Sequence, residues 1–118
     1  MKILFLAFAT CFAFTANDKI TGRWESKPSQ KGNVTGVVFK TDNSLEGYVN
    51  RKPFVSGTYS FNIEDSTLSF VDNGCNGAKG AYKVMFYHNS DSLRFSVISD
   101  SCNERREGMQ RLIMGRVK

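Results

Sequence analysis

The side chains that could support covalent or metal chemistry are few in this chain and follow no catalytic pattern. The single histidine, His88, comes directly before the turn-forming residues 89–91, so we interpret it as a turn residue. A catalytic relay needs a base held against a nucleophile, and His88 has neither a recognisable motif nor a free cysteine beside it. Cysteine and histidine pairs with the spacing of metal ligands are absent. We therefore expect a protein that is not an enzyme and that holds no metal or other cofactor.

The N-terminus has the pattern of a secretory signal peptide over residues 1–16. Lys2 precedes an apolar run, 3–14, that is too short to cross a bilayer as a mature helix. An alternative interpretation is a loose lipobox ending at Cys11, which would be lipidated after cleavage. The first interpretation predicts a secreted or periplasmic protein with no membrane span and one mature domain over residues 17–118.

Length and charge set limits on the mature domain. Roughly 100 residues are enough for one modest core. Loss of Lys2 with the signal peptide lowers the formal net charge from +5 to +4. The basic residues are spread along the chain, and the pair Arg105-Arg106 is flanked by Glu104 and Glu107. Because no block of basic residues is present to track phosphates, we expect no nucleic-acid partner.

Two cysteines, Cys75 and Cys102, remain in the mature chain. An even number of cysteines in an exported protein predicts a disulfide between them. Two unpaired buried thiols are the alternative. A disulfide would be a large part of the stability of so short a chain.

Alternating apolar and polar residues dominate the chain, and this period of two predicts strands. The expected strands are Ile20–Lys27, Val34–Thr41, Leu45–Arg51, Phe54–Asn62, Thr67–Asp72, Gly80–His88, Leu93–Ser99 and Met109–Val117. Only Asn103–Gly108 has a composition that could form a helical turn. The fold class is therefore all-β.

A recurring turn signal indicates how these strands are connected. Asp18, Asp42, Asp65 and Asp91 each stand just before the aliphatic residue that starts an odd-numbered strand. Tight turns of one kind at one end are typical of an antiparallel up-and-down meander, and eight such strands can close into a barrel. The loops that follow the fifth and seventh strands would lie at the same end of that barrel. This topology brings the two cysteine-bearing loops together.

Three features together resemble a known family. Gly22-Arg23-Trp24 lies on the first strand, eight strands follow in hairpin order, and an arginine lies near the end of the last strand. This pattern resembles the lipocalin-like, calycin-type barrels, and more narrowly the small signal-peptide-bearing lipocalin-like proteins of bacteria. The resemblance implies that Trp24 lies across the closed end of the barrel under an arginine, with Arg116 the better match and Arg111 the second. The chain is shorter than the long-studied lipocalins and shows no C-terminal helix after the barrel.

The predicted strands also define a candidate ligand site inside the barrel. Small-molecule pockets are built from an apolar lining with a few polar groups. The lining predicted from the inward faces of the fourth to seventh strands consists of Tyr59, Phe61, Leu68, Phe70, Tyr82, Val84, Phe86, Phe95 and Val97. Four cations are expected at the rim, where they would favour an acidic headgroup: Lys52, Lys79, Arg105 and Arg106. The alternative is that the aromatic rings only fill a ligand-free core.

Three functions from different classes fit this pattern. The first is an exported lipocalin-like carrier that binds a small apolar or amphipathic molecule without catalysis. The second is a rigid scaffold whose disulfide-tied loops, 73–79 and 100–108, bind or inhibit a protein. The third is an avidin-like binder, since avidin-type barrels also begin with a Gly-x-Trp strand, but those proteins wall their pocket with several tryptophans and this chain has one.

Overall fold

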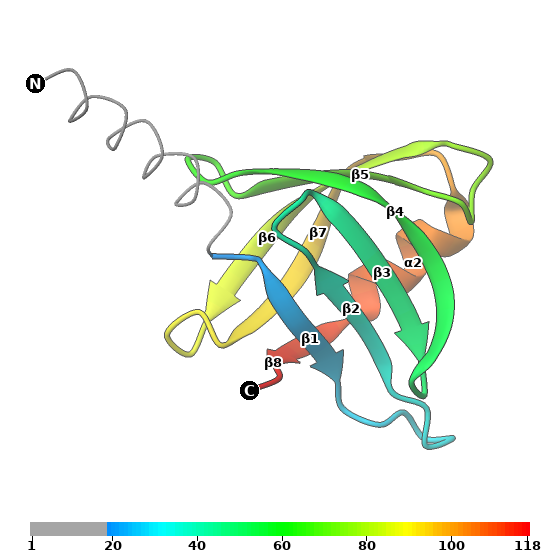
Figure 1. Cartoon of the computed structure of the whole chain (residues 1–118), viewed down its shortest axis with the longest axis vertical. Helices are drawn as coiled ribbons and strands as arrows, with labels where there is room; N and C mark the ends of the chain where they lie inside the picture. The colour runs from blue at the N-terminus through cyan, green and yellow to red at the C-terminus, as the bar shows by residue number, and fades with distance from the viewer. Residues whose placement is uncertain (1–18) are drawn as a thin grey trace, which may run out of the picture.

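The computed structural model describes residues 19–118, so the predicted signal peptide and Cys11 lie outside the described residues. Eight strands and one helix follow one another along the chain (Figure 1). Their bounds are β1 Gly22–Ser26, β2 Thr35–Phe39, β3 Ser44–Val49, β4 Lys52–Asn62, β5 Thr67–Asp72, β6 Lys79–Tyr87, β7 Ser92–Asp100, α2 Asn103–Arg111 and β8 Ile113–Arg116. Within this part of the chain, no helix is long and apolar enough to cross a membrane.

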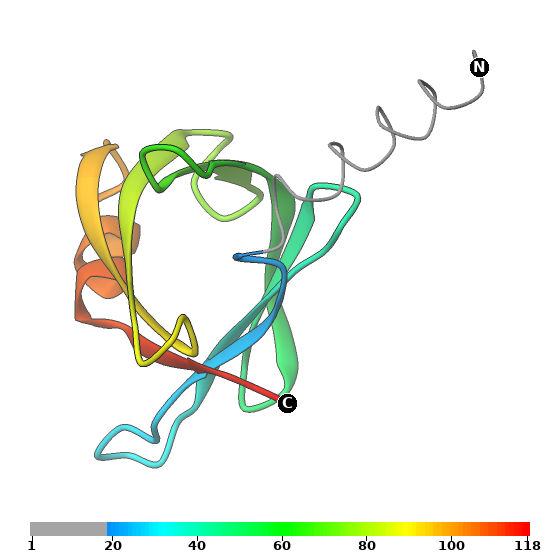
Figure 2. The ribbon, with the colours of Figure 1, turned by 90° about the vertical axis from the view of Figure 1, so that its left-hand side faces the viewer.

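The strands form a closed barrel in sequence order. Each strand pairs antiparallel with the next, and β8 pairs with β1 through the partners Trp24 and Arg116. Figure 2 shows the strands as a ring, with α2 beside β7. The predicted fold class, an all-β eight-stranded antiparallel up-and-down barrel, is confirmed.

The last part of the chain differs from the prediction. A strand over Met109–Val117 is wrong in its first half, because α2 is a nine-residue helix and β8 has only four residues. The helix is rich in Glu, Arg, Met and Gln, which have good helix propensity. Glu104 in its first turn and Arg111 in its last turn also suit the helix dipole. These local preferences outweigh the weak alternation of the segment.

Alternation along the strands directs one set of side chains into the barrel. The pattern is clearest in β5, where Leu68, Phe70 and Asp72 are buried and the residues between them are not. The buried apolar core consists of Ile20, Trp24, Phe39, Leu45, Tyr59, Phe61, Leu68, Phe70, Tyr82, Val84, Leu93, Phe95 and Met114. Partly buried Val37, Phe86, Val97, Met109 and Leu112 pack against it.

One end of the barrel is closed by Trp24 and Arg116. The Arg116 guanidinium carbon lies 4.2 Å from the centre of a Trp24 ring. Its Nη1 and Nη2 donate to the carbonyls of Thr21 and Lys19, each at 2.8 Å, and Trp24 Nε1 donates to the carbonyl of Ile20. The stack that the family resemblance implies is therefore present, and it ties the chain before β1 to the base of the barrel.

Two irregularities change the phase of the alternation. Between β3 and β4 the pairing passes from Gly47 with Val55 to Tyr48 with Pro53, which leaves Phe54 as an extra residue. Between β6 and β7 it passes from Tyr82 with Val97 to Ala81 with Ser99, which leaves Ile98 as an extra residue. Bulges of this kind re-aim the side chains that follow, and the second one turns Asp100 into the barrel, where it is buried.

Candidate ligand-binding cavity

A cavity of about 560 Å³ lies at the end of the barrel opposite Trp24. Its walls come from β2, the β3–β4 hairpin, β5 and one face of α2, with Phe95 of β7 and Met114 of β8. The apolar lining residues include Val37, Phe39, Leu45, Val55, Leu68, Phe70, Phe95, Met109, Leu112 and Met114. This volume falls within the range of small-molecule sites, and the lining is of the mainly apolar kind that such sites have.

The predicted lining residues divide into two groups. Leu68, Phe70 and Phe95 line the cavity. The other six point inward but pack in the core below it rather than on its wall: Tyr59, Phe61, Tyr82, Val84, Phe86 and Val97. In part, the rings do fill the barrel, as the alternative interpretation supposed. The cavity lies beside these packed residues, under α2.

Helix α2 supplies the wall that the sequence did not predict. Besides Asn103 at the start of α2, the residues that line the cavity from this segment share one helix face: Glu104, Arg105, Gly108, Met109 and Leu112. Gly108 lies in the middle of this stripe, and a Cβ added there would have nothing within 4 Å. The helix therefore faces empty space at its centre.

The predicted disulfide between Cys75 and Cys102 is confirmed, and both cysteines lie at the cavity mouth. Cys102 is also the residue that precedes the first turn of α2. The disulfide therefore joins the start of the helix to the β5–β6 loop and fixes one side of the mouth.

A buried polar cluster lies beside the disulfide, centred on Arg105. Its Nε and Nη2 donate to the two carboxylate oxygens of Asp100 at 2.8 Å each, and Nη2 also donates to the carbonyl of Ala78. Its Nη1 lies 3.4 Å from the Oδ2 atom of Asp72. The guanidinium carbon lies 4.9 Å from the centre of the Phe70 ring. Arg105 thus joins α2 to β5, β7 and the β5–β6 loop.

Asp100 also accepts a hydrogen bond from the Tyr82 hydroxyl and another from the Cys102 amide. Burial alone would raise the pKa of Asp100, but the hydrogen bonds from Arg105, Tyr82 and Cys102 outweigh it and lower that pKa to about 2. Burial, followed by the hydrogen bond to Asp100, raises the pKa of Tyr82 well above its usual value. Across the ordinary pH range this cluster therefore holds a charged Asp100 and a neutral Tyr82.

The four expected rim cations do not act as a group. Lys52 and Lys79 are exposed and do not line the cavity. Arg106 donates through Nη1 to the backbone carbonyl of Asp100 at 2.9 Å. The Arg105 side chain, expected at an exposed rim, is only 9% exposed, and Asp100 pairs with it. His88 is exposed in the β6–β7 turn, away from the cavity.

Sequence reasoning missed the role of Asp72 and Asp100. Asp72 is two residues after Phe70 and four after Leu68, so it lies on the same, inward face of β5. The alternation of the strand alone could therefore have placed Asp72 inside the barrel. Each aspartate also accepts a hydrogen bond from the amide two residues later, Gly74 and Cys102 respectively. Both strands thus end in the same turn, with a buried carboxylate facing Arg105.

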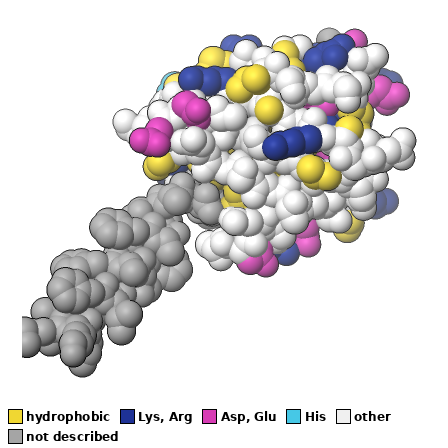
Figure 3. All heavy atoms as spheres, turned by 90° about the horizontal axis from the view of Figure 1, so that it is seen from above, with side chains coloured by type: hydrophobic (Ala, Val, Ile, Leu, Met, Phe, Trp, Pro, Cys, Tyr) yellow, Lys and Arg dark blue, Asp and Glu magenta, His cyan; other side chains and the backbone are white. Residues whose placement is uncertain are grey.

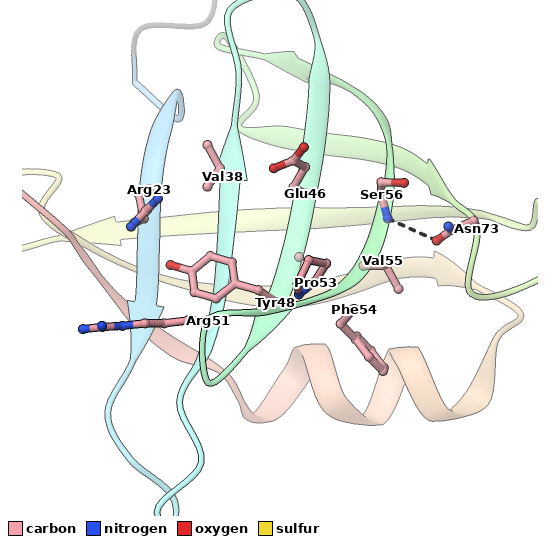
Figure 4. A pocket seen from close by; sticks show the side chains of 11 residues that line it. Arg23, Val38, Glu46, Tyr48, Arg51, Pro53, Phe54, Val55, Ser56 and Asn73 are labelled. Atoms are coloured by element: carbon pink, nitrogen blue, oxygen red, sulfur yellow. Dashed lines mark hydrogen bonds between the residues drawn. The ribbon is translucent and has the colours of Figure 1, made fainter.

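A second hollow, of about 540 Å³, lies on the outer face of β1–β4 (Figure 4). Tyr48 crosses over Gly36 and donates from its hydroxyl to Glu25 at 2.5 Å. Arg23 and Arg51 lie on either side of the Tyr48 ring in this view. Any side chain at position 36 would collide with that ring, so the glycine is needed for the tyrosine to cover the sheet.

Charged side chains of both signs are interspersed on the surface seen in Figure 3. Among residues 19–118, no group of three or more His, Cys, Asp and Glu side chains could hold a metal ion.

No protein-family model matches the chain, and no curated protein shows significant sequence similarity to it.

Proposed function

We propose that the barrel binds a small apolar or amphipathic molecule in the cavity beneath α2, without covalent chemistry. The observation that carries this proposal is the cavity itself, because a barrel of this size could have been filled by side chains. Burial of a ligand against the aliphatic and aromatic lining would stabilise the complex at roughly 25 cal/mol per Å² of apolar surface. The mode of action is that of a lipocalin-like carrier.

The proposal also includes export. The basic start and apolar run of residues 1–16 support a signal peptide, and the disulfide supports an oxidising compartment, secreted or periplasmic. Anchoring through a lipidated Cys11 is the alternative form of the same proposal.

The test is a fluorescence titration with N-phenylnaphthylamine, an uncharged probe that brightens in apolar surroundings. The wild type is expected to bind it saturably. Gly108→Phe places a ring in the empty centre of the helix face and is expected to weaken binding by about tenfold or more. Gly108→Ala is the matched control, since it changes the same helix position but leaves most of the space. Equal binding by the wild type and Gly108→Phe would contradict the proposal.

A second candidate function is protein binding by the loops at the cavity mouth. It is favoured by Phe54, which is 73% exposed and lines the cavity together with Cys75 and Cys102 of the disulfide-tied loops. A binder of this kind would be impaired by Phe54→Ser and indifferent to Gly108→Phe. A carrier would be impaired by Gly108→Phe, and this variant decides between the two functions, because Phe54 itself also lines the cavity.

A further inference from the structure

The charged residues of the cavity wall lie where α2 meets the end of β5. The charged residues that line the cavity are Asp72, Glu104 and Arg105, and their formal charges sum to −1. Asp100, which contacts Arg105 from behind, adds another negative charge. The single guanidinium is therefore already outnumbered by carboxylates.

One polar atom in this cluster is left without a hydrogen bond. Arg105 Nη1 is buried and has no hydrogen-bond partner among the described residues. It faces Asp72 Oδ2 at 3.4 Å, which is too long for a good hydrogen bond. The two side chains are only 9% and 5% exposed. An unpartnered buried donor costs free energy, and a ligand atom that satisfied it would gain affinity.

The geometry of this pair selects a particular kind of ligand group. Arg105 Nη1 and Asp72 Oδ2 are 3.4 Å apart and belong to two residues of the cavity wall, so a small movement of the Asp72 side chain would let one oxygen atom lie within about 3 Å of both. That oxygen would accept a hydrogen bond from the guanidinium and donate one to the carboxylate. A hydroxyl group can both accept and donate a hydrogen bond, whereas an ether oxygen can only accept one. An ionised carboxylate also only accepts hydrogen bonds, and its negative charge is repelled by Asp72 and Glu104.

We propose that the cavity selects an amphipathic ligand with an apolar chain and an uncharged hydroxyl head, which binds between Arg105 Nη1 and the Asp72 carboxylate. This inference rests on the proposed binding function. It replaces the acidic headgroup expected from the rim cations, since Arg105 is committed to Asp100 and Lys52 and Lys79 do not line the cavity.

The test is displacement of bound N-phenylnaphthylamine by four ligands with the same ten-carbon chain: decanol, decyl methyl ether, decanoate and decylamine. At about pH 8 the acid is ionised and the amine is protonated. Decanol is expected to compete about tenfold more strongly than the ether, which lacks the donor, and more strongly still than decanoate. Asp72→Asn, which is nearly isosteric, is expected to reduce the preference for decanol over decanoate by about tenfold.

The outcomes separate the two proposals. If the probe does not bind the wild type, the binding function fails and this inference fails with it. If the probe binds but decanol competes no better than its ether, or if decanoate or decylamine competes best, the hydroxyl site is wrong while the cavity proposal stands. If Asp72→Asn does not fold, the comparison of the four ligands on the wild type still decides the question.

Discussion

Arg105 of α2 and Asp100 of β7 are joined by two parallel hydrogen bonds, Nε to Oδ2 and Nη2 to Oδ1, each of 2.8 Å. The helix has no fully buried residue, so its position over the barrel depends on a few specific contacts. This two-bonded ion pair and the disulfide at Cys102 are the main ones. These contacts hold α2 over the rim, where Met109 and Leu112 line the cavity from the helix side and also pack against the core.

The Arg105–Asp100 pair predicts an acid-sensitive contribution to stability. The pKa of Asp100 is lowered to about 2 in the folded protein. The stabilisation is therefore complete above the unfolded pKa of about 3.9 and is lost as the pH falls through about 2. We expect the difference in free energy of unfolding between the wild type and Asp100→Asn to shrink by about 2 kcal/mol between about pH 5 and pH 2.

Denaturant unfolding at a series of pH values measures this difference. Asp65→Asn is the control, because Asp65 lies in an exposed turn and only accepts a hydrogen bond from the Thr67 amide. A difference for Asp100→Asn that stays constant down to about pH 2 would show that the pair does not lower this pKa in the folded state.

The disulfide is expected to account for much of the stability of the domain. It closes a separation of 27 residues, for which the chain-entropy model gives about 3.5 kcal/mol. The double variant Cys75→Ser with Cys102→Ser should lose about this amount in urea unfolding. The reduced wild type should match it, and a loss below about 1 kcal/mol would contradict the expectation.

Gly108 offers a stabilising substitution inside the proposed site. The residue is helical, and an added Cβ meets nothing within 4 Å. Gly108→Ala should therefore raise the free energy of unfolding by about 1 kcal/mol through helix propensity alone. Thermal unfolding measures the gain. A loss of stability would mean that the helix face at this position is packed rather than open.

Arg116 at the closed end is not expected to tolerate replacement by lysine. Lysine cannot both lie flat on Trp24 and donate to the carbonyls of Lys19 and Thr21. Arg116→Lys should lower stability by about 2 kcal/mol and shift the emission of Trp24, the only tryptophan in the chain. Arg111→Lys on the exposed side of α2 is the control and should change neither quantity.

The sequence predicts the barrel well because alternation and turn residues are local signals. In β5, for example, the alternation of apolar and polar residues directly identifies Leu68 and Phe70 as the side chains that point into the barrel. The helix and the site are harder to predict. Asp100 reaches the interior only because Ile98 is an extra residue in β7, and no local signal marks that bulge. The position of Arg105 depends in turn on Asp100, so the cluster emerges only when the strands and helix are assembled.

The most direct test of the binding proposal is a methyl NMR titration of the labelled protein with N-phenylnaphthylamine. Ring currents from a probe in the cavity should shift the methyl groups of Val37, Leu68, Met109 and Leu112, and leave that of the exposed Ile63 unchanged. Shifts concentrated at Val38 on the outer hollow, with the cavity methyl groups unmoved, would contradict binding inside the barrel.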